Sequence, residues 1–405
     1  MRKTHQKNTV RYYLLILTFL LFLFISGDFG LVDVQRTAIV MAVGIDREDD
    51  TFILTSQIAI PQSAKQGKST ETVQLVSRGE TVAQAFEEIN AKTGWYPKLV
   101  FCHLIILGEK TAQNNVFDAL DFFLLDEYLS DNCLIATCQG LAADLLNVTA
   151  LVDPSGSLAM QKVLSSHSER VGTVLTSTLR EFSIGYFSDS KSAFLPVLST
   201  QPQQEKIGQK PSGNSSNSSS NEGSSNNGKS ENNSQDKPVF TAGETALFVG
   251  GKRVGALSKE DTFAFNAVKN KLRLATYTVE NDGGRYSFTI RRNSPKVKFS
   301  LNKDGKMKVK IHLTMTAGLL DCSKSLSLEE GKDAGDIPKS AFENAEVLLS
   351  SQITALFEKC RIVNCDLFEV HSALQKQEKK RYEKLKDNIL QNAEVEVSVR
   401  FQGVR

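Results

Sequence analysis

The chain has 405 residues, 40% hydrophobic and 23% charged, so most of it should fold around apolar cores in more than one domain. Lysine and arginine total 48 against 46 aspartate and glutamate residues, and the net charge is +2. Four of the positive residues lie within residues 1–11, so the rest of the chain is slightly acidic, which argues against nucleic-acid binding. Six cysteines are too few for a disulfide scaffold.

Residues 1–27 are typical of a signal peptide or an uncleaved membrane anchor. Residues 1–11 are polar and basic, and residues 12–25 are apolar except for Thr18. As a helix, residues 12–25 would extend about 21 Å, less than the roughly 30 Å hydrocarbon core of a bilayer. This length favours a secretory signal, and an anchor that is never cleaved is the alternative. The basic flank predicts that everything downstream lies on the extracytoplasmic side.

Strands and helices alternate in residues 28–199, which predicts an N-terminal α/β domain with a mixed sheet. Apolar or alternating runs predict strands at 36–46, 52–60, 72–77, 99–107 and 133–138. Helices are predicted at 81–94, about 116–124, and 141–146. In the first of these, Thr81 and Gln84 have capping-box spacing and Gly94 is the expected C-cap.

Residues 200–238 predict a disordered linker. The stretch 212–234 is almost wholly serine, asparagine and glycine. Such a segment buries too little apolar area to offset its ordering entropy.

The remainder predicts a small middle domain at 239–284 and a C-terminal α+β domain at 285–405. Hairpins are expected with Gly250-Gly251 as the turn and around 281–284 and 302–305, and a final strand is expected at 395–401. Helices are expected after the cap Ser258, from Asp336, and over 371–390, where the helix is charged. This half reads as an antiparallel sheet packed by two helices.

No familiar catalytic motif is present in the sequence, which lacks GxGxxG, the P-loop, HExxH and GxSxG. We therefore predict no catalytic, cofactor-binding or metal-binding residue and no cofactor. Cys133 and Cys138 are five positions apart on a predicted strand, so they should point to opposite faces. Cys360 and Cys365 flank a helix end, where buried free thiols are favoured over a disulfide.

His103 lies among apolar neighbours and is interpreted as a core histidine. Five lysines alternate along two paired strands and should share one sheet face: Lys296, Lys298, Lys306, Lys308 and Lys310. A solvated face is the favoured interpretation of this stripe. Contact with anionic lipid head groups is the alternative, to which the charged helix at 371–390 would add.

Several stretches, in order, resemble the Ger(x)C family, the C subunits of GerA-type spore germinant receptors. They are Asp33-Val34 with residues 37–46 (TAIVMAVGID), 104–109 (LIILGE), 120–126 (LDFFLLD), 243–257 (GETALFVGGKRVGAL), 365–368 (CDLF) and 393–401. Together they cover nearly the whole chain outside the linker.

The sequence departs from the family pattern at three places. Asp28 stands at the expected lipobox cysteine, and Phe29 stands where the family has tryptophan. Since aspartate has no thiol, no lipidation site is predicted, and attachment is expected through the N-terminal apolar segment or partner subunits. Glu369 and His371 replace glycines of a family stretch.

The resemblance implies an α+β, multi-domain fold, with mixed and antiparallel sheets packed by helices in a three-domain architecture. It implies a non-enzymatic, lipoprotein-like subunit that works with membrane-bound A and B subunits at the outer face of the spore inner membrane, in the response to nutrients. Assembly or signal coupling is the expected role, and direct small-molecule binding stays open. The alternatives are an extracytoplasmic solute-binding protein and a cell-wall hydrolase.

Overall fold

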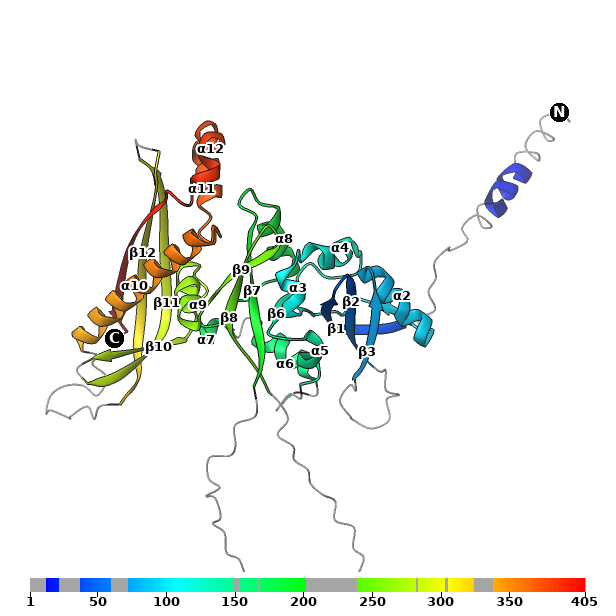
Figure 1. The fold of residues 1–405 in the computed structure, drawn as a ribbon, viewed down its shortest axis with the longest axis horizontal. Coiled ribbons are helices and arrows are strands. Elements are labelled where there is room, and N and C mark those ends of the chain that lie inside the picture. Colours follow the sequence, from blue (N-terminus) through cyan, green and yellow to red (C-terminus); the bar gives the residue numbers. More distant parts are fainter. Residues whose placement is uncertain are drawn as a thin grey trace, which may run out of the picture.

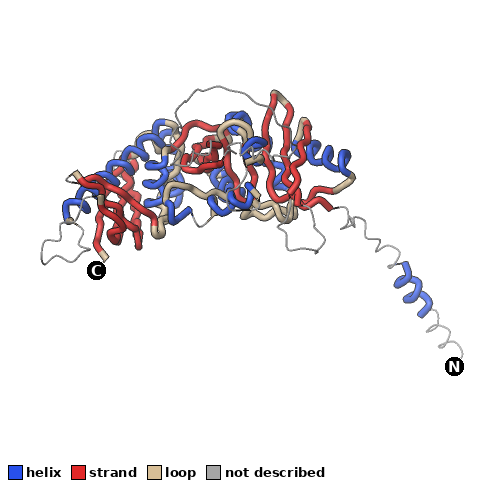
Figure 2. Tube along the Cα trace, turned by 90° about the horizontal axis from the view of Figure 1, so that it is seen from below, coloured by secondary structure: helices blue, strands red, loops and turns tan. Residues whose placement is uncertain are grey.

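The structure is a computed structural model that describes residues 12–21, 37–59, 72–148, 153, 155–165, 168–201, 239–281, 283–302, 305–323 and 338–404. It forms an elongated molecule with two sheets, and strands β1–β3 and the second sheet lie at opposite ends of its long axis (Figures 1 and 2). Residues 12–21 are helical and exposed, and no helix in the described part of the chain is both long and apolar enough to cross a bilayer. Asp28 and most of the predicted N-terminal segment and linker lie outside the described residues.

The first sheet has nine strands in the order β3-β2-β1-β5-β6-β7-β8-β9, with β4 paired to β1. The strands are β1 (Thr37–Glu48), β2 (Thr51–Ala59), β3 (Thr72–Gly79), β4 (Tyr96–Lys98), β5 (Leu104–Leu107), β6 (Leu134–Cys138), β7 (Ser192–Gln201), β8 (Val239–Val249) and β9 (Lys252–Leu257). The helices in this part of the chain are α2 (Val82–Thr93), α3 (Glu109–Gln113), α4 (Phe117–Leu125), α5 (Ala142–Leu146), α6 (Gly156–Val163), α7 (Ser168–Val171) and α8 (Leu179–Phe187), of which α7 contacts β10 of the second sheet.

Apolar clusters cover both faces of this sheet, as the near-continuous apolar runs of β1 and β5 require. One cluster joins the sheet to α2, α4 and α8, and the other joins it to α5 and α6. Helix α2 has the predicted ends: the Thr81 side chain accepts the Gln84 N–H, and Gly94 takes the left-handed conformation. The predicted strand at 99–107 is shorter in the structure, because residues 99–102 form a turn closed by the Cys102 N–H on the Leu99 carbonyl.

The first sheet continues past the predicted linker. Strands β7 and β8 are antiparallel neighbours, with Leu195 opposite Ala246, and β9 follows β8 through Gly250-Gly251. Both turn glycines have positive φ, as the predicted tight hairpin requires. The strands within residues 239–284, predicted as a middle domain, therefore belong to two different sheets. Strands β8 and β9 extend the first sheet, whereas β10 is the first strand of the second sheet.

The second sheet has the order β10-β11-β12-β13. Its strands are β10 (Ala275–Asn281), β11 (Gly284–Leu301), β12 (Met307–Cys322) and β13 (Glu394–Gly403), and its helices are α9 (Lys259–Val268), α10 (Lys339–Ile362), α11 (Val370–Gln377) and α12 (Lys379–Leu385), followed by a 3-10 turn at Lys386–Asn388. One large apolar cluster joins the inner face of this sheet to α9, α10 and α11. The α+β class, with a mixed sheet and a largely antiparallel sheet packed by helices, is confirmed.

Three details of this half differ from the prediction. Strand β13 is parallel to β12, since the helical connection through α10 carries the chain back across the sheet before it pairs. The second strand of the hairpin predicted around 281–284 and the first strand of the hairpin predicted around 302–305 form one continuous strand, β11. Strand β10 pairs only as far as Ile290, so Pro295 lies where β11 has one unpaired edge. The charged helix predicted over 371–390 is interrupted at Glu378.

Candidate functional site at the junction of the two halves

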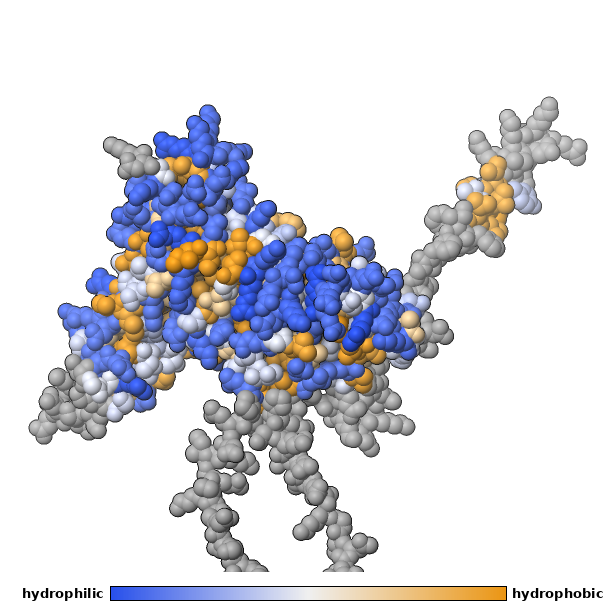
Figure 3. All heavy atoms as spheres, viewed as in Figure 1, coloured by the Kyte–Doolittle hydropathy of each residue, from blue (hydrophilic) through white to orange (hydrophobic). Residues whose placement is uncertain are grey.

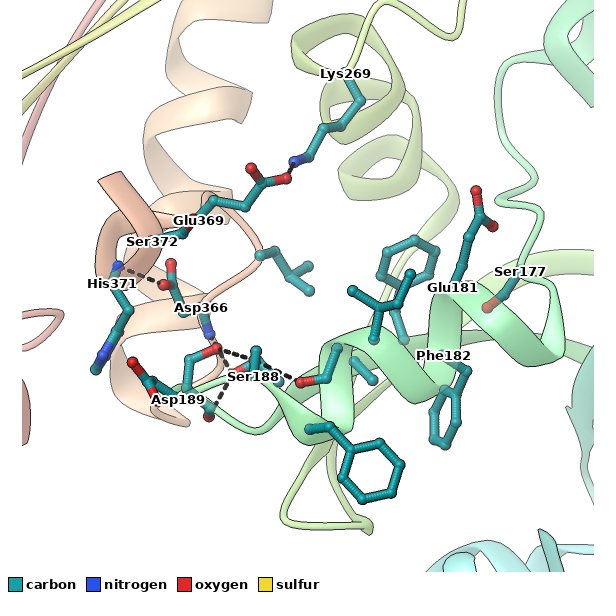
Figure 4. Close-up of a pocket in the computed structure, with 18 of the residues that line it drawn as sticks. Ser177, Glu181, Phe182, Ser188, Asp189, Lys269, Asp366, Glu369, His371 and Ser372 are labelled. Carbon is teal, nitrogen blue, oxygen red and sulfur yellow. Dashed lines mark hydrogen bonds and ion pairs between the residues drawn. The ribbon is translucent and has the colours of Figure 1, made fainter. Parts of the chain in front are cut away.

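We call the first sheet with its helices the first half, and the second sheet with its helices the second half. A cavity of about 560 Å³ lies where α8 and β7 of the first half meet α9 and α11 of the second (Figure 4). Its wall combines apolar side chains of α8 with charged and hydroxyl groups from both halves. The charged or titratable lining side chains are Glu181, Asp189, Lys269, Asp366, Glu369 and His371. Both halves therefore contribute polar groups to this cavity, and the bonds of these groups show what the arrangement can do.

Asp366 is the central anchor of the junction. Its buried carboxylate accepts the N–H groups of Val370 at 2.9 Å and His371 at 2.8 Å, at the start of α11. Its own N–H donates to Ser192 Oγ, the first residue of β7, at 2.8 Å. Burial raises the pKa of the Asp366 carboxyl above its ordinary value, although the two backbone N–H bonds act in the opposite direction. The residue thus caps a helix of one half while it bonds to a strand of the other.

Glu369 turns the chain into α11 in the left-handed conformation, with φ of 62°. This region favours glycine, and Glu369 is one of the two positions where the family pattern has glycine. The Glu369 carboxylate forms an ion pair with Lys269 just after α9. The substitution therefore adds a charge contact at the rim of the cavity where the backbone geometry alone would prefer glycine.

Two further contacts cross the junction. The Gln375 Nε2 donates to Asp189 Oδ2 at 2.7 Å, which joins α11 to the turn before β7. The Asn266 side chain, buried on α9, donates to the carbonyls of Gly172 at 2.8 Å and Val174 at 3.1 Å. The two halves are consequently held by directional polar bonds as well as by apolar packing.

The polar groups of this cavity are mostly engaged with the protein itself. The carboxylates of Asp366, Asp189 and Glu369 accept bonds or ion pairs from named partners, and Glu181 accepts the Thr178 N–H in the capping box of α8. Within the described ranges, no group of three or more histidine, cysteine, aspartate or glutamate side chains could hold a metal ion. The geometry fits a junction that fixes the relative position of two halves.

Apolar side chains gather on the surface beside the junction, where α10 ends near β9 (Figure 3). Ile362 is 80% exposed, and Val254 of β9 is also exposed. Next to Ile362 in the chain, the Val363 side chain lies 3.6 Å from the position that a Cβ on Gly255 would occupy, so the end of α10 contacts β9. We call Val254 and Ile362 the junction patch; its two members belong to different halves.

The motif residues of the N-terminal half have structural roles. The buried Asp46 carboxylate accepts the N–H groups of Ala142 and Ala143 at the start of α5. Gly108 packs against it, because a Cβ there would lie 2.0 Å from Asp46 Oδ1. Gly44 faces Ala142 and Leu146 in the same way. These residues position α5 and α3 on the sheet.

Five of the six cysteines are buried, and His103 is partly buried just before β5. Cys133 and Cys138 belong to clusters on opposite faces of the first sheet. All six cysteines are free thiols, and Cys360 and Cys365 are both buried in the second core. Burial lowers the pKa of His103. Its Nε2 is buried and has no hydrogen-bond partner among the described residues.

The lysine stripe does lie on one face of the second sheet, but much of its charge is paired within the sheet. Lys306 contacts Glu394 at 3.2 Å, and Lys308 and Lys310 contact Glu396 at 2.8 and 3.4 Å. Both glutamates come from β13, which lies beside β12. A solvated, mixed-charge face accounts for these three lysines better than a lipid-binding surface does.

Sequence reasoning did not find the junction. The family resemblance points to residues 365–368, Glu369 and His371, but no motif in the sequence marks Asp189, Ser192 or Lys269. These residues come from turns and from a strand start far away in the sequence, and the only available signal was the non-glycine residue at 369.

Comparisons with known proteins agree with this architecture. The family described as "spore germination protein N-terminal domain" matches residues 31–200, and the family described as "spore germination B3/GerAC like, C-terminal" matches residues 243–403. Spore germination protein B3 of Bacillus subtilis (strain 168) is 29% identical over 149 residues, 35% of this chain and 37% of that protein. Spore germination protein A3 of the same organism is 26% identical over 180 residues, 42% of this chain and 47% of that protein.

These alignments span less than half the length of either curated relative. Among solved structures, the crystal structure of the GerBC protein matches with a TM-score of 0.50 and 17% identity, over 90% of this chain and 97% of that one. This likeness supports the fold.

Proposed function

Because the chain belongs to the Ger(x)C family of spore germination proteins, we propose that it acts as the C subunit of a nutrient germinant receptor, by assembly or signal coupling with A and B subunits. Both halves match the family in chain order, and this observation carries the proposal. Its working position is the outer face of the spore inner membrane. The role is non-enzymatic: the subunit passes a change in position between its membrane partners.

The junction supports coupling as the mode of action. The Asp366–Ser192 and Gln375–Asp189 bonds link elements of different halves, so a partner that moves one half also moves the other. The junction patch offers such a partner apolar surface from both halves at once.

A germination assay tests this function. Spores that lack the gene, in a strain without a redundant receptor, should fail to respond to at least one nutrient, and the wild-type gene should restore the response. Ile362→Lys should restore it poorly while the protein level stays normal. Val347→Lys, on an exposed part of α10 away from β9, is the matched control and should restore the response fully. Normal nutrient germination of the deletion strain would rule out the proposed function.

Attachment to the membrane uses the apolar segment 12–25 or the partner subunits instead of diacylglycerol, since Asp28 stands at the expected lipobox position. Mass spectrometry of the membrane-extracted protein should find an N-terminus without acyl groups. An acylated N-terminus would contradict this attachment without touching the receptor role.

A solute-binding protein remains the second candidate, and the 560 Å³ cavity between the halves is the observation that favours it. Calorimetry of the purified chain with single nutrients separates the two. Saturable binding that Lys269→Ala abolishes would favour solute binding, and heats no larger than those of dilution would favour coupling alone.

A further inference from the structure

Exposed aromatic side chains gather at one edge of the first sheet. Strands β4 and β5 are both parallel to β1, and β6 is parallel to β5, so these four strands begin at the same edge. The segment that leads into β5 and the segment that leads into β6 meet there. A direct contact joins them: the Lys98 Nζ lies 4.4 Å from the centre of the Tyr128 ring.

Five large apolar side chains at this edge are exposed to solvent. Trp95 is 40% exposed and Phe101 is 61% exposed, and Tyr96, Val100 and Tyr128 are about half exposed. We call these five residues the aromatic patch. Tryptophan and tyrosine combine an apolar ring with a polar group, and this combination suits the boundary between water and lipid tails.

A hollow extends the aromatic patch along α2. It has a volume of about 430 Å³, and Tyr96 lines it together with Pro97. The other apolar lining side chains are Ala83, Phe86, Ala91 and Phe122. Tyr96 belongs to both features, so the patch and the hollow form one continuous apolar surface.

The path of the chain links this surface to the N-terminal apolar segment. Thr37, the first residue of β1, is paired with Tyr96 of the patch. Residue 37 follows residue 25, the end of the apolar segment, by 12 positions, which an extended chain spans in at most about 43 Å. A bilayer that holds the apolar segment 12–25 therefore stays within reach of the aromatic patch.

We infer that the aromatic patch docks into the interface of that bilayer, so that the folded protein itself contacts lipid. This inference rests on the membrane attachment proposed above. The charges beside the patch are mixed: Lys98 lies over the Tyr128 ring, Lys92 is paired with Glu88 at 3.1 Å, and the segment around Tyr128 carries the acidic residues Asp126, Glu127 and Asp131. Asp126 is already engaged, since its Oδ1 accepts the N–H groups of Tyr128 and Leu129. The contact accordingly needs no anionic lipid.

Trp95 is the single tryptophan of the chain, so its fluorescence reports on the patch directly. The experiment reconstitutes the full chain into phosphatidylcholine vesicles, with and without bromine on the acyl chains. The Trp95 emission should shift to the blue, lose about half its intensity on brominated lipid, and become protected from iodide. Phe101→Ser should reduce the lipid quenching at least about twofold, whereas Ile362→Ser, at the junction patch, should leave it unchanged.

Flotation of the vesicles, measured in the same samples, separates the inference from membrane attachment. Protein that floats with the vesicles while Trp95 stays open to iodide and unquenched by brominated lipid would overturn the inference and leave attachment intact. Shielding of Trp95 only after A and B subunits are added, without lipid quenching, would also overturn it and assign the patch to a protein partner. Loss of germination in the deletion strain tests the proposed function independently of both outcomes.

Discussion

The Asp366 N–H donates to Ser192 Oγ across 2.8 Å, and this buried bond joins the cap of α11 to the first residue of β7. Each side chain also forms a second hydrogen bond: the Asp366 carboxylate accepts the Val370 N–H at the start of α11, and Ser192 Oγ donates to the Ser190 carbonyl. One change at Ser192 therefore acts on both halves.

Ser192→Ala should loosen the junction locally. The substitution leaves the buried Asp366 N–H without its acceptor, which costs about 2 kcal/mol. Hydrogen exchange of the Asp366 amide should accelerate by about 30-fold. Ser199→Ala, on the same strand, is the control and should leave that exchange rate unchanged. Equal rates in the wild type and Ser192→Ala would mean that the bond does not hold the junction.

Glu369 offers a test of backbone strain against charge. Its φ of 62° costs a non-glycine residue about 1 kcal/mol, while the Lys269 ion pair is partly exposed and contributes less than about 1 kcal/mol. Both Glu369→Gly and Glu369→Ala remove the ion pair, but only glycine relieves the strain. Urea unfolding should therefore find Glu369→Gly more stable than Glu369→Ala by about 1 kcal/mol. The reverse order would contradict the assigned conformation.

The fold was largely readable from local patterns. Thr81, Gln84 and Gly94 predict the ends of helix α2, and Gly250-Gly251 predict the hairpin turn, because capping and turn geometry depend on residues that are neighbours in the sequence. The continuation of the first sheet from β7 to β8 could not be read, because a long polar segment separates two strands that pair directly. The parallel pairing of β13 likewise depends on the path of the chain through α10.

The junction could not be predicted either, because its bonds also join residues that are far apart in the sequence. Asp366 was visible as part of a motif, yet its partner Ser192 lies 174 positions earlier in the chain. Serine, glutamine and asparagine are uncharged and common on protein surfaces, so their positions in the sequence do not predict such long-range bonds. The stretch 37–46 is recognisable in the sequence, but the role of its last residue, Asp46, depends on Gly108 and Ala142, which only the packed sheet brings close to it.

Gly108→Ala should strongly destabilise the N-terminal half. The added Cβ would lie 2.0 Å from Asp46 Oδ1, so the carboxylate must move and release the N–H groups of Ala142 and Ala143. The expected loss in the free energy of unfolding is about 3 kcal/mol. Gly255→Ala is the matched control: its Cβ would make an ordinary contact with Val363 at 3.6 Å, and stability should change by less than about 1 kcal/mol. Similar urea midpoints for the two variants would refute the packing role of Gly108.

His103 should make the protein sensitive to mild acid. Burial lowers its pKa in the folded protein below the ordinary value of 6.5, whereas the unfolded chain keeps that value. As the pH falls through 6.5, the unfolded state binds the proton first, so the free energy of unfolding decreases. Each pKa unit of difference corresponds to about 1.4 kcal/mol once the pH is below both values.

His103→Gln removes this titration, so the stability of the wild type relative to this variant should fall between pH 7.5 and pH 5. An NMR titration of the wild-type ring provides an independent check and should place its midpoint below 6.5. Parallel stability curves for the wild type and His103→Gln, together with a midpoint at or above 6.5, would show that His103 is solvated instead of held neutral in the core. The two measurements together decide the point, since the variant alone also changes packing beside β5.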